Sequence, residues 1–141
     1  MFNVIKQSGV IPYRIKKGNV EILLITSSKG KRWIVPKGWI EPHMSSADSA
    51  VKEAYEEAGV LGSIITPAIG SYESRKWGLP CSVEIFLMKV ETVLDNWEEA
   101  HTRERKWLSV DKAIDWVDGK NLKQILQRCQ QELAASALQG Q

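Results

Sequence analysis

The chain has 141 residues, the length of one domain, which is enough to bury a hydrophobic core without disulfides. Hydrophobic residues make up 43% and charged residues 26%, as in ordinary globular proteins, and a formal net charge of +2 is too small to indicate nucleic-acid binding. No segment is long and apolar enough for a signal peptide or a membrane span, so we expect a cytoplasmic protein. Cys81 and Cys129 lie in apolar segments and predict free thiols in a reducing compartment.

No linker or internal repeat divides the sequence, so residues 1–141 are interpreted as a single domain. Its core is expected at about 8–117 and its C-terminal helix at about 120–138. Patterns of β-branched and aromatic residues predict strands at 8–15, 20–27, 31–38, 61–74, 81–93 and 105–110. Gly78 and Pro80 predict a loop over 75–80, and Pro36 and Gly38 are expected to end the third strand.

Helices are expected at 45–58, 111–117 and 122–138. The last of these carries an apolar stripe at helical spacing, formed by Leu122, Ile125, Leu126, Cys129 and Leu133. In the first, Ser45 and Asp48 resemble a capping box, and Gly59 is placed to end the helix in a left-handed conformation. One face of this helix is small and apolar, with Ala47, Ala50, Val51, Ala54 and Ala58.

Three carboxylates border that apolar face: Glu53, Glu56 and Glu57. Like charges at these spacings destabilise a helix by only about 0.2–0.5 kcal/mol per pair, so a solvated charged face is one interpretation. The alternative is a site for a divalent cation, because Mg²⁺ prefers hard oxygen ligands and is bound through few carboxylates plus substrate phosphates.

The context of the glutamates resembles the Nudix hydrolases, whose signature is Gly-x5-Glu-x7-Arg-Glu-U-x-Glu-Glu-x-Gly-U, where U is a bulky aliphatic residue. The matching positions here are Gly38, Glu53, Glu56, Glu57, Gly59 and Val60. Met44, Lys52 and Ala54 depart from the signature at the first Glu, the Arg and an aliphatic position. The resemblance implies an α+β fold, an α/β/α sandwich with a mixed central β-sheet flanked by helices.

Two of the departures concern a structural pair. In the family the first Glu and the Arg are expected to pair and to brace the loop against the helix. With Met44 and Lys52 at these positions, we expect the brace to be lost without stranding a buried charge. Met44 is expected to fill the gap with a flexible apolar side chain and to spare catalysis.

The resemblance also implies roles for the site residues. Glu53 and Glu57, with the carbonyl of Gly38, are expected to bind Mg²⁺, with Mn²⁺ as a possible substitute. Glu56 is expected to act as the base that orients or deprotonates water. Glu98 or Glu99, in a loop, could instead supply the base or bind another metal ion.

Further segments, including "YESRK" and "RERKWLSVDKAIDWV", look like the branch that hydrolyses diphosphoinositol and diadenosine polyphosphates. The residues expected to bind such a substrate, each also interpretable as ordinary surface polarity, are Ser27, Ser28, Lys29, Arg32, Lys37, Arg75 and Lys76. Trp39 and Trp77 lie near this site and could stack on a base, whereas Trp33, Trp107 and Trp116 are expected in the core.

The predicted function is therefore metal-dependent hydrolysis of a phosphoanhydride bond in a small-molecule polyphosphate, with no membrane partner. One alternative is a pyrophosphohydrolase acting on nucleoside triphosphates or on an RNA 5′ end. Apart from such an RNA 5′ end, no nucleic-acid partner is expected. Another is a non-catalytic binding module with the same fold. The sequence does not specify an oligomeric state.

Overall fold

The structure, a computed structural model, describes residues 4–139 of the chain; residues 1–3 and 140–141 at the ends of the predicted domain lie outside it. Its strands form one sheet in the order β3-β2-β1-β6-β5, with β4 paired to β1 and β7 paired to β2. Pairing of β1 with β6 is parallel and the other pairings are antiparallel, so the sheet is mixed, as predicted. The strands are β1 (Ile5–Lys16), β2 (Asn19–Thr26), β3 (Trp33–Ile34), β4 (Lys37–Trp39), β5 (Val60–Lys76), β6 (Leu79–Val93) and β7 (Arg105–Ser109).

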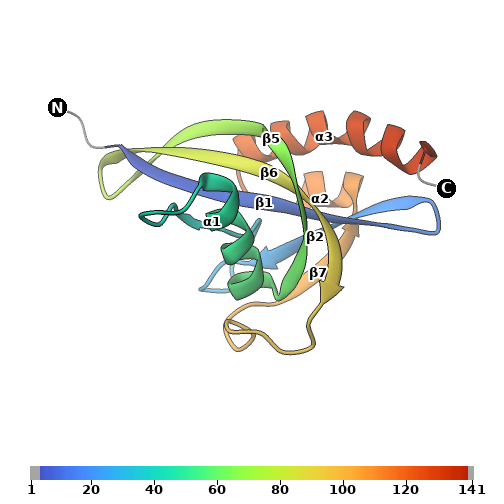
Figure 1. The fold of residues 1–141 in the computed structure, drawn as a ribbon, viewed down its shortest axis with the longest axis horizontal. Helices are drawn as coiled ribbons and strands as arrows, with labels where there is room; N and C mark the ends of the chain where they lie inside the picture. Colours follow the sequence, from blue (N-terminus) through green and yellow to red (C-terminus); the bar gives the residue numbers. More distant parts are fainter. Residues whose placement is uncertain (1–3, 140–141) are drawn as a thin grey trace.

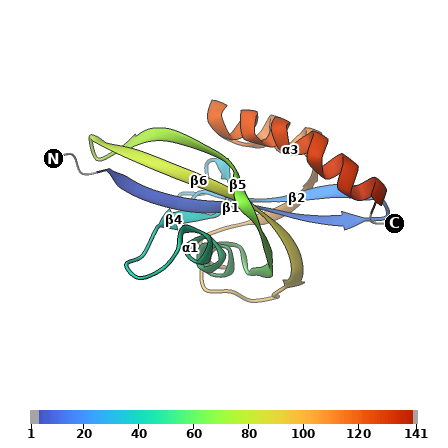
Figure 2. The ribbon, with the colours of Figure 1, turned by 45° about the horizontal axis from the view of Figure 1, so that its top comes forward.

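Helices cover both faces of this sheet (Figures 1 and 2). They are α1 (Ser46–Glu53), which continues into the π-helical turn η1 (Ala54–Ala58), then α2 (Val110–Trp116) and α3 (Lys120–Gln139). Each face has its own hydrophobic core, one under α1 and η1 and the other under α2 and α3. None of the helices in the described part of the chain is long and apolar enough to span a membrane.

The apolar stripes predicted for two helices are confirmed. The five residues of the C-terminal stripe are all buried beneath α3. Ala50, Ala54 and Ala58 are completely buried against the other face of the sheet, where their small side chains let the helix approach closely. The Ser45 hydroxyl accepts a hydrogen bond from the Asp48 N–H at 3.0 Å, and Gly59 ends the segment at a φ of 66°, as predicted.

Two predictions of local structure were wrong. The loop expected over 75–80 is a tight hairpin turn at Trp77 and Gly78, because the pairing of β5 with β6 extends to Lys76 and Leu79. The strand expected over 31–38 is split into β3 and β4 around Val35 and Pro36. Proline provides no N–H for a continuous ladder, and the chain passes at this point from a pairing with β2 to a pairing with β1.

One tryptophan predicted in the core lies at the surface. Trp116 is 38% exposed, because Ala113 and Val117 occupy the buried positions around α2. Its ring rests against Trp33 with a centroid separation of 5.3 Å. Trp33 and Trp107 are half-buried and pack against the two cores. The two cysteines are buried and free, as expected.

Candidate functional site

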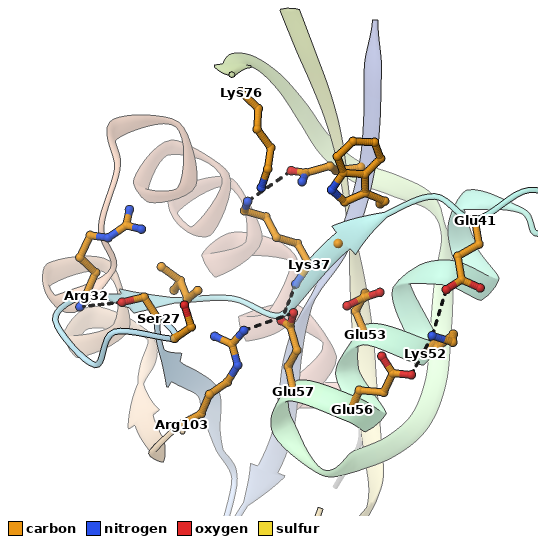
Figure 3. A pocket seen from close by; sticks show the side chains of 15 residues that line it. Ser27, Arg32, Lys37, Glu41, Lys52, Glu53, Glu56, Glu57, Lys76 and Arg103 are labelled. Carbon is orange, nitrogen blue, oxygen red and sulfur yellow. Dashed lines mark hydrogen bonds and ion pairs between the residues drawn. The ribbon is translucent and has the colours of Figure 1, made fainter. Parts of the chain in front are cut away.

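A cavity of about 470 Å³ opens between the β2–β3 loop, β4 and the inner face of α1 and η1 (Figure 3). Carboxylates line one side of it, and basic side chains from the strands and loops line the other. The cavity therefore brings together two charge types that lie apart in the sequence, which is the arrangement required to hold an anionic ligand together with a cation.

Glu53 lies directly against Gly38 of β4. A Cβ atom at position 38 would come within 2.4–2.6 Å of the Glu53 carboxylate atoms, so a larger residue there would displace this carboxylate. Gly38 pairs with Ser8 of β1, which holds its backbone in the sheet. Burial, followed by the charge of Glu56, raises the pKa of Glu53. The Glu53 carboxylate is thus confined at the wall of the cavity, where a bound cation would relieve its desolvation.

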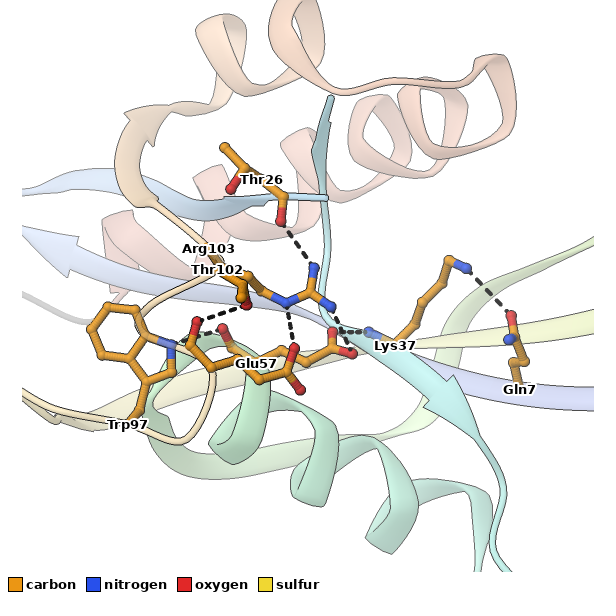
Figure 4. Close-up of polar contacts among 8 residues, drawn as sticks. Gln7, Thr26, Lys37, Glu57, Trp97, Thr102 and Arg103 are labelled. Atoms are coloured by element: carbon orange, nitrogen blue, oxygen red, sulfur yellow. Dashed lines mark hydrogen bonds and ion pairs between the residues drawn. The ribbon is translucent and has the colours of Figure 1, made fainter. Parts of the chain in front are cut away.

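Glu57 is the most enclosed of the three carboxylates, at 7% exposure. Its Oε1 accepts a hydrogen bond from the Lys37 N–H at 3.0 Å, and its Oε2 lies 3.5 Å from Nη2 of Arg103. Burial raises the pKa of Glu57, although the Arg103 guanidinium and the Lys37 N–H oppose this effect. The Glu57 carbonyl accepts a hydrogen bond from Nε1 of Trp97 at 3.0 Å, so the backbone is also held (Figure 4).

Arg103 is a site residue that the sequence analysis missed. Its side chain is 9% exposed, and its Nε lies 2.8 Å from Oε1 of Glu99. Its Nη1 donates to the carbonyl of Thr26 at 2.9 Å, which ties the loop before β7 to the end of β2 (Figure 4). Two arginines, Arg103 and Arg105, lie in this part of the sequence, and no local signal distinguishes the one that reaches Glu57.

Glu56 faces a different neighbourhood from Glu57. Its Oε2 lies 2.7 Å from Nζ of Lys52, and the same Nζ lies 3.1 Å from Oε1 of Glu41 (Figure 3). The prediction that the brace would be lost was therefore wrong. Glu41 provides the carboxylate that Met44 lacks, from three positions earlier in the chain, and Lys52 keeps a partner in the loop before α1.

Five of the seven residues predicted to bind substrate line the cavity: Ser27, Ser28, Arg32, Lys37 and Lys76. Lys29 and Arg75 do not line it; both are exposed, and Arg75 donates to the carbonyl of Gly78 in the hairpin.

Two of the basic residues predicted to bind substrate have partners of their own. Arg32 lies 3.2 Å from Asp118, and Lys37 Nζ donates to Gln7, another lining residue that the sequence did not indicate. Burial, followed by the charge of Lys76, lowers the pKa of Lys37.

The two loop glutamates predicted as alternatives differ in position. Glu98 is exposed and does not line the cavity. Glu99 is half-buried and pairs with Arg103, and its N–H donates to the carbonyl of Glu56 at 3.1 Å. Glu99 therefore contacts the backbone of the glutamate segment through its own backbone and contacts Arg103 through its side chain.

The donor set fits a small divalent cation. Within residues 4–139 no group of three or more His, Cys, Asp or Glu side chains is arranged to hold a metal ion, and Glu56 pairs with Lys52. Mg²⁺, however, needs only one or two protein carboxylates when substrate phosphates and water complete its coordination. Glu53 lies against Gly38, and its carboxyl group is within hydrogen-bond reach of the Glu57 carboxyl group. Both groups are partly removed from water, so together they provide the two protein carboxylates that such a cation needs.

Comparisons with known proteins agree with this geometry. The sequence profile of the NUDIX domain matches residues 6–129. Nudix hydrolase 21, chloroplastic, from Arabidopsis thaliana is 34% identical over 125 residues, which cover 84% of this chain and 63% of the relative. Diphosphoinositol polyphosphate phosphohydrolase 3-beta from Bos taurus is 32% identical over 112 residues, covering 77% of this chain and 66% of the relative.

A solved structure also matches the fold. The crystal structure of a binary complex of a C. elegans Ap4A hydrolase superposes with a TM-score of 0.80 and 26% sequence identity, covering 93% of this chain and 98% of that one. The chain spans less than two thirds of the length of either curated relative described above.

Proposed function

The chain belongs to the NUDIX domain family, and from this premise we propose that it hydrolyses a phosphoanhydride bond of a polyphosphate with the aid of Mg²⁺ or Mn²⁺. The proposed substrates are diadenosine polyphosphates or diphosphoinositol polyphosphates, the compounds named in two of the relatives. The observation that carries the proposal is the pairing of Glu53 and Glu57 beside Gly38 in a cavity that also holds Lys37 and Lys76.

Glu53, Glu57 and the carbonyl of Gly38 are the groups that would hold the cation. When bound, the ion supplies Lewis acidity toward the phosphate oxygens. Glu57 is held in place by the Lys37 N–H and Arg103, so its carboxylate needs little reorganisation when the site fills. This rigidity supports a ligand role for Glu57 rather than a role in moving protons.

Glu56 is the proposed proton acceptor from the attacking water. Its side chain is 22% exposed and is held by Lys52, so it remains accessible to water while its position is restrained. A general base must reach its proton donor within hydrogen-bond distance, and the cavity lining includes Glu56. Glu99 is the weaker candidate because, unlike Glu56, it does not line the cavity.

The phosphate chain is proposed to contact Ser27, Ser28, Arg32, Lys37 and Lys76, which line the cavity. Lysine and arginine neutralise phosphate oxygens, and hydroxyl groups donate hydrogen bonds to them. Lys29 and Arg75 are left out of this set because they do not line the cavity.

The location and the domain organisation are part of the same proposal. Two free, buried cysteines support a reducing compartment such as the cytoplasm, while the names of several relatives place those proteins in chloroplasts or mitochondria. A single sheet that includes strands from β1 to β7 supports the interpretation of the chain as one domain.

Replacing Glu53 with glutamine tests the proposal. Glu57 also holds Arg103 and the Lys37 N–H, so Glu53→Gln is the cleaner way to remove one carboxylate charge. We expect kcat with Mg²⁺ on diadenosine or diphosphoinositol polyphosphates to fall at least about 100-fold, because several kcal/mol of transition-state stabilisation depend on the bound ion. Mn²⁺ affinity, measured by electron paramagnetic resonance, should fall in parallel.

The matched control is Glu73→Gln, which makes the same chemical change at an exposed position of β5. It should leave turnover and Mn²⁺ affinity unchanged. If Glu53→Gln retains both, the assigned cation site is wrong. If the unaltered protein releases no product from diadenosine polyphosphates, diphosphoinositol polyphosphates, nucleoside triphosphates or 5′-triphosphate RNA, a non-catalytic binding module is the better description.

A further inference from the structure

Two exposed tryptophans meet at the rim of the phosphate cavity. Trp39 is the last residue of β4, and Trp77 occupies the hairpin turn between β5 and β6. Their ring centroids lie 5.4 Å apart with an interplanar angle of 42°. Trp39 is 46% exposed and Trp77 is 75% exposed, so two large apolar rings together face the solvent. Large apolar side chains that gather on a surface usually mark a binding site.

The pair is continuous with the cavity. Trp39 lines the cavity itself and directly follows Gly38, against which the Glu53 carboxylate lies. Lys76 also lines the cavity, and its Nζ lies 5.5 Å from the centroid of the Trp77 ring. When the phosphates of a ligand contact Lys76, the group attached to those phosphates therefore lies within reach of the Trp77 indole.

The position of Trp77 is conformationally unfavourable for an indole. Trp77 has a φ of 52° and Gly78 a φ of 75°, which is the pattern of a two-residue hairpin turn that favours Asn-Gly or Gly-Gly. A side chain in this backbone conformation is disfavoured, and its ring gains little burial in return. The hairpin would be at least as stable with asparagine at position 77, so folding does not account for the tryptophan.

A second tryptophan pair provides the contrast. Trp33 and Trp116 meet at almost the same separation, 5.3 Å, but Trp33 is half-buried and packs against the core beneath α2 and α3. That pair covers apolar core surface. Trp39 and Trp77 are each more exposed than Trp116, and their pair borders a charged cavity.

We propose that the Trp39–Trp77 pair binds the base of a nucleoside polyphosphate whose phosphate chain occupies the cavity. This inference rests on the proposed function and narrows its substrate class to compounds that carry an aromatic base. The ring of an inositol polyphosphate is saturated and offers no π face for stacking. The two indoles are too close to admit a base between them, since that would require about twice a 3.5 Å contact distance, so the base stacks on the exposed face of the pair.

The test compares two ligands with a diphosphate group, of which ADP carries a nucleoside and pyrophosphate does not. The binding of ADP and of inorganic pyrophosphate is measured by calorimetry for the unaltered protein, Trp77→Ala and Trp39→Ala. We expect each variant to bind ADP at least about fivefold more weakly, the lower end of what one stacked base contributes, and Trp77→Ala to bind pyrophosphate unchanged. Trp77→Ala is the decisive variant because its side chain is the more exposed.

Trp116→Ala is the matched control, since it removes one exposed ring of the other indole pair. It should alter the binding of neither ligand. The proposal is overturned if Trp77→Ala binds ADP normally, or if it loses ADP and pyrophosphate equally. Binding requires no turnover, so these outcomes are separate from a failure of the protein to hydrolyse any polyphosphate.

Discussion

Two cationic side chains each hold a pair of carboxylates beside the cavity, and they do so in different surroundings. Arg103 is 9% exposed and pairs with Glu57 and Glu99. Lys52 is 37% exposed and pairs with Glu56 and Glu41. The charge pattern is the same in both clusters, with one cation between one glutamate of the helical segment and one glutamate of a loop.

The difference lies in what each cation must compensate. Arg103 lies where Glu57 is desolvated, and it also donates to the Thr26 carbonyl, so it joins η1, β2 and the loop before β7. Arginine suits this position because its planar group donates several hydrogen bonds in fixed directions. Lys52 lies nearer to water, where an ion pair stabilises weakly and mainly restrains geometry. Burial therefore predicts a stability role for the first cluster and a positioning role for the second.

Removing the buried cation should have the largest effect. In Arg103→Met, Glu57 stays buried with its charge uncompensated by any guanidinium, and the Thr26 carbonyl loses a donor. We expect the free energy of unfolding, measured by urea denaturation, to fall by about 3 kcal/mol. Arg128→Met is the control, because Arg128 is an exposed arginine that also donates to a carbonyl, that of Ile69, and its loss should change stability little.

A double variant separates the charge from the side-chain packing. Arg103→Met combined with Glu57→Gln leaves no carboxylate stranded at Glu57, so part of the lost stability should return, although activity should not. If the double variant is as unstable as the sum of the two single variants, the Arg103–Glu57 pair does not couple and the buried-charge explanation is wrong.

The sequence predicted much of the scaffold because the relevant signals are local. The cap at Ser45, the left-handed Gly59 and the small apolar face of α1 each depend on residues within a few positions of one another. The spacing of the glutamates and the resemblance to the Nudix signature also predicted a common site for Glu53 and Gly38, and these two residues lie against each other. The fold predicted from that resemblance, an α+β sandwich with a mixed sheet, is confirmed.

The residues that the sequence did not reveal are connected through space rather than along the chain. Arg103 donates to a carbonyl 77 positions away, and Trp97 donates to one 40 positions away. Lys52 was expected to have lost its loop partner, because the signature places the acid at position 44 and gives no weight to Glu41. The π-helical turn at Ala54–Ala58 was not expected either, since the apolar period of the segment fits an ordinary helix.

The exposed cluster should show a smaller effect, and on activity rather than stability. Glu41→Gln leaves Lys52 with Glu56 alone and removes the ion pair between Lys52 and the loop before α1, so Glu56 is held less precisely. We expect kcat to fall by up to about tenfold, the lower end for residues that orient a site, with Mn²⁺ affinity little changed. Restoring a carboxylate at the position of the family signature, in Glu41→Gln with Met44→Glu, should recover turnover.

Recovery of turnover in the double variant would show that Glu41 acts by bracing Lys52 and that its negative charge alone is not what matters. Met44→Glu alone should change turnover little, because Lys52 already has two partners. A large rise in that single variant would show that Met44 limits turnover. If the double variant recovers nothing, Glu41 acts through some contact other than Lys52.

The smallest predicted effect uses pH to separate the two clusters. Hydrogen bonds to Glu56 and then Glu41 raise the pKa of Lys52 above its ordinary value. Because the pKa of Lys52 is higher in the folded state, its ammonium group stabilises the fold. This stabilisation is fully present below the unfolded-state pKa of about 10.4 and is lost as the pH rises through the folded-state pKa. The difference in Tm between the unaltered protein and Lys52→Met should therefore stay constant up to about pH 10 and then shrink.

The corresponding difference for Arg103→Met should not shrink over that range, because arginine stays protonated and Glu57, whose pKa burial raises to about 8, is ionised there in the unaltered protein. Burial raises the pKa of Tyr72 and of Cys129 to about 12, so the ionisation of these groups destabilises every variant as the solution becomes more alkaline. That effect is common to all the proteins compared and cancels in the differences. If both differences shrink together, the two clusters are not energetically distinct, and burial does not separate their roles.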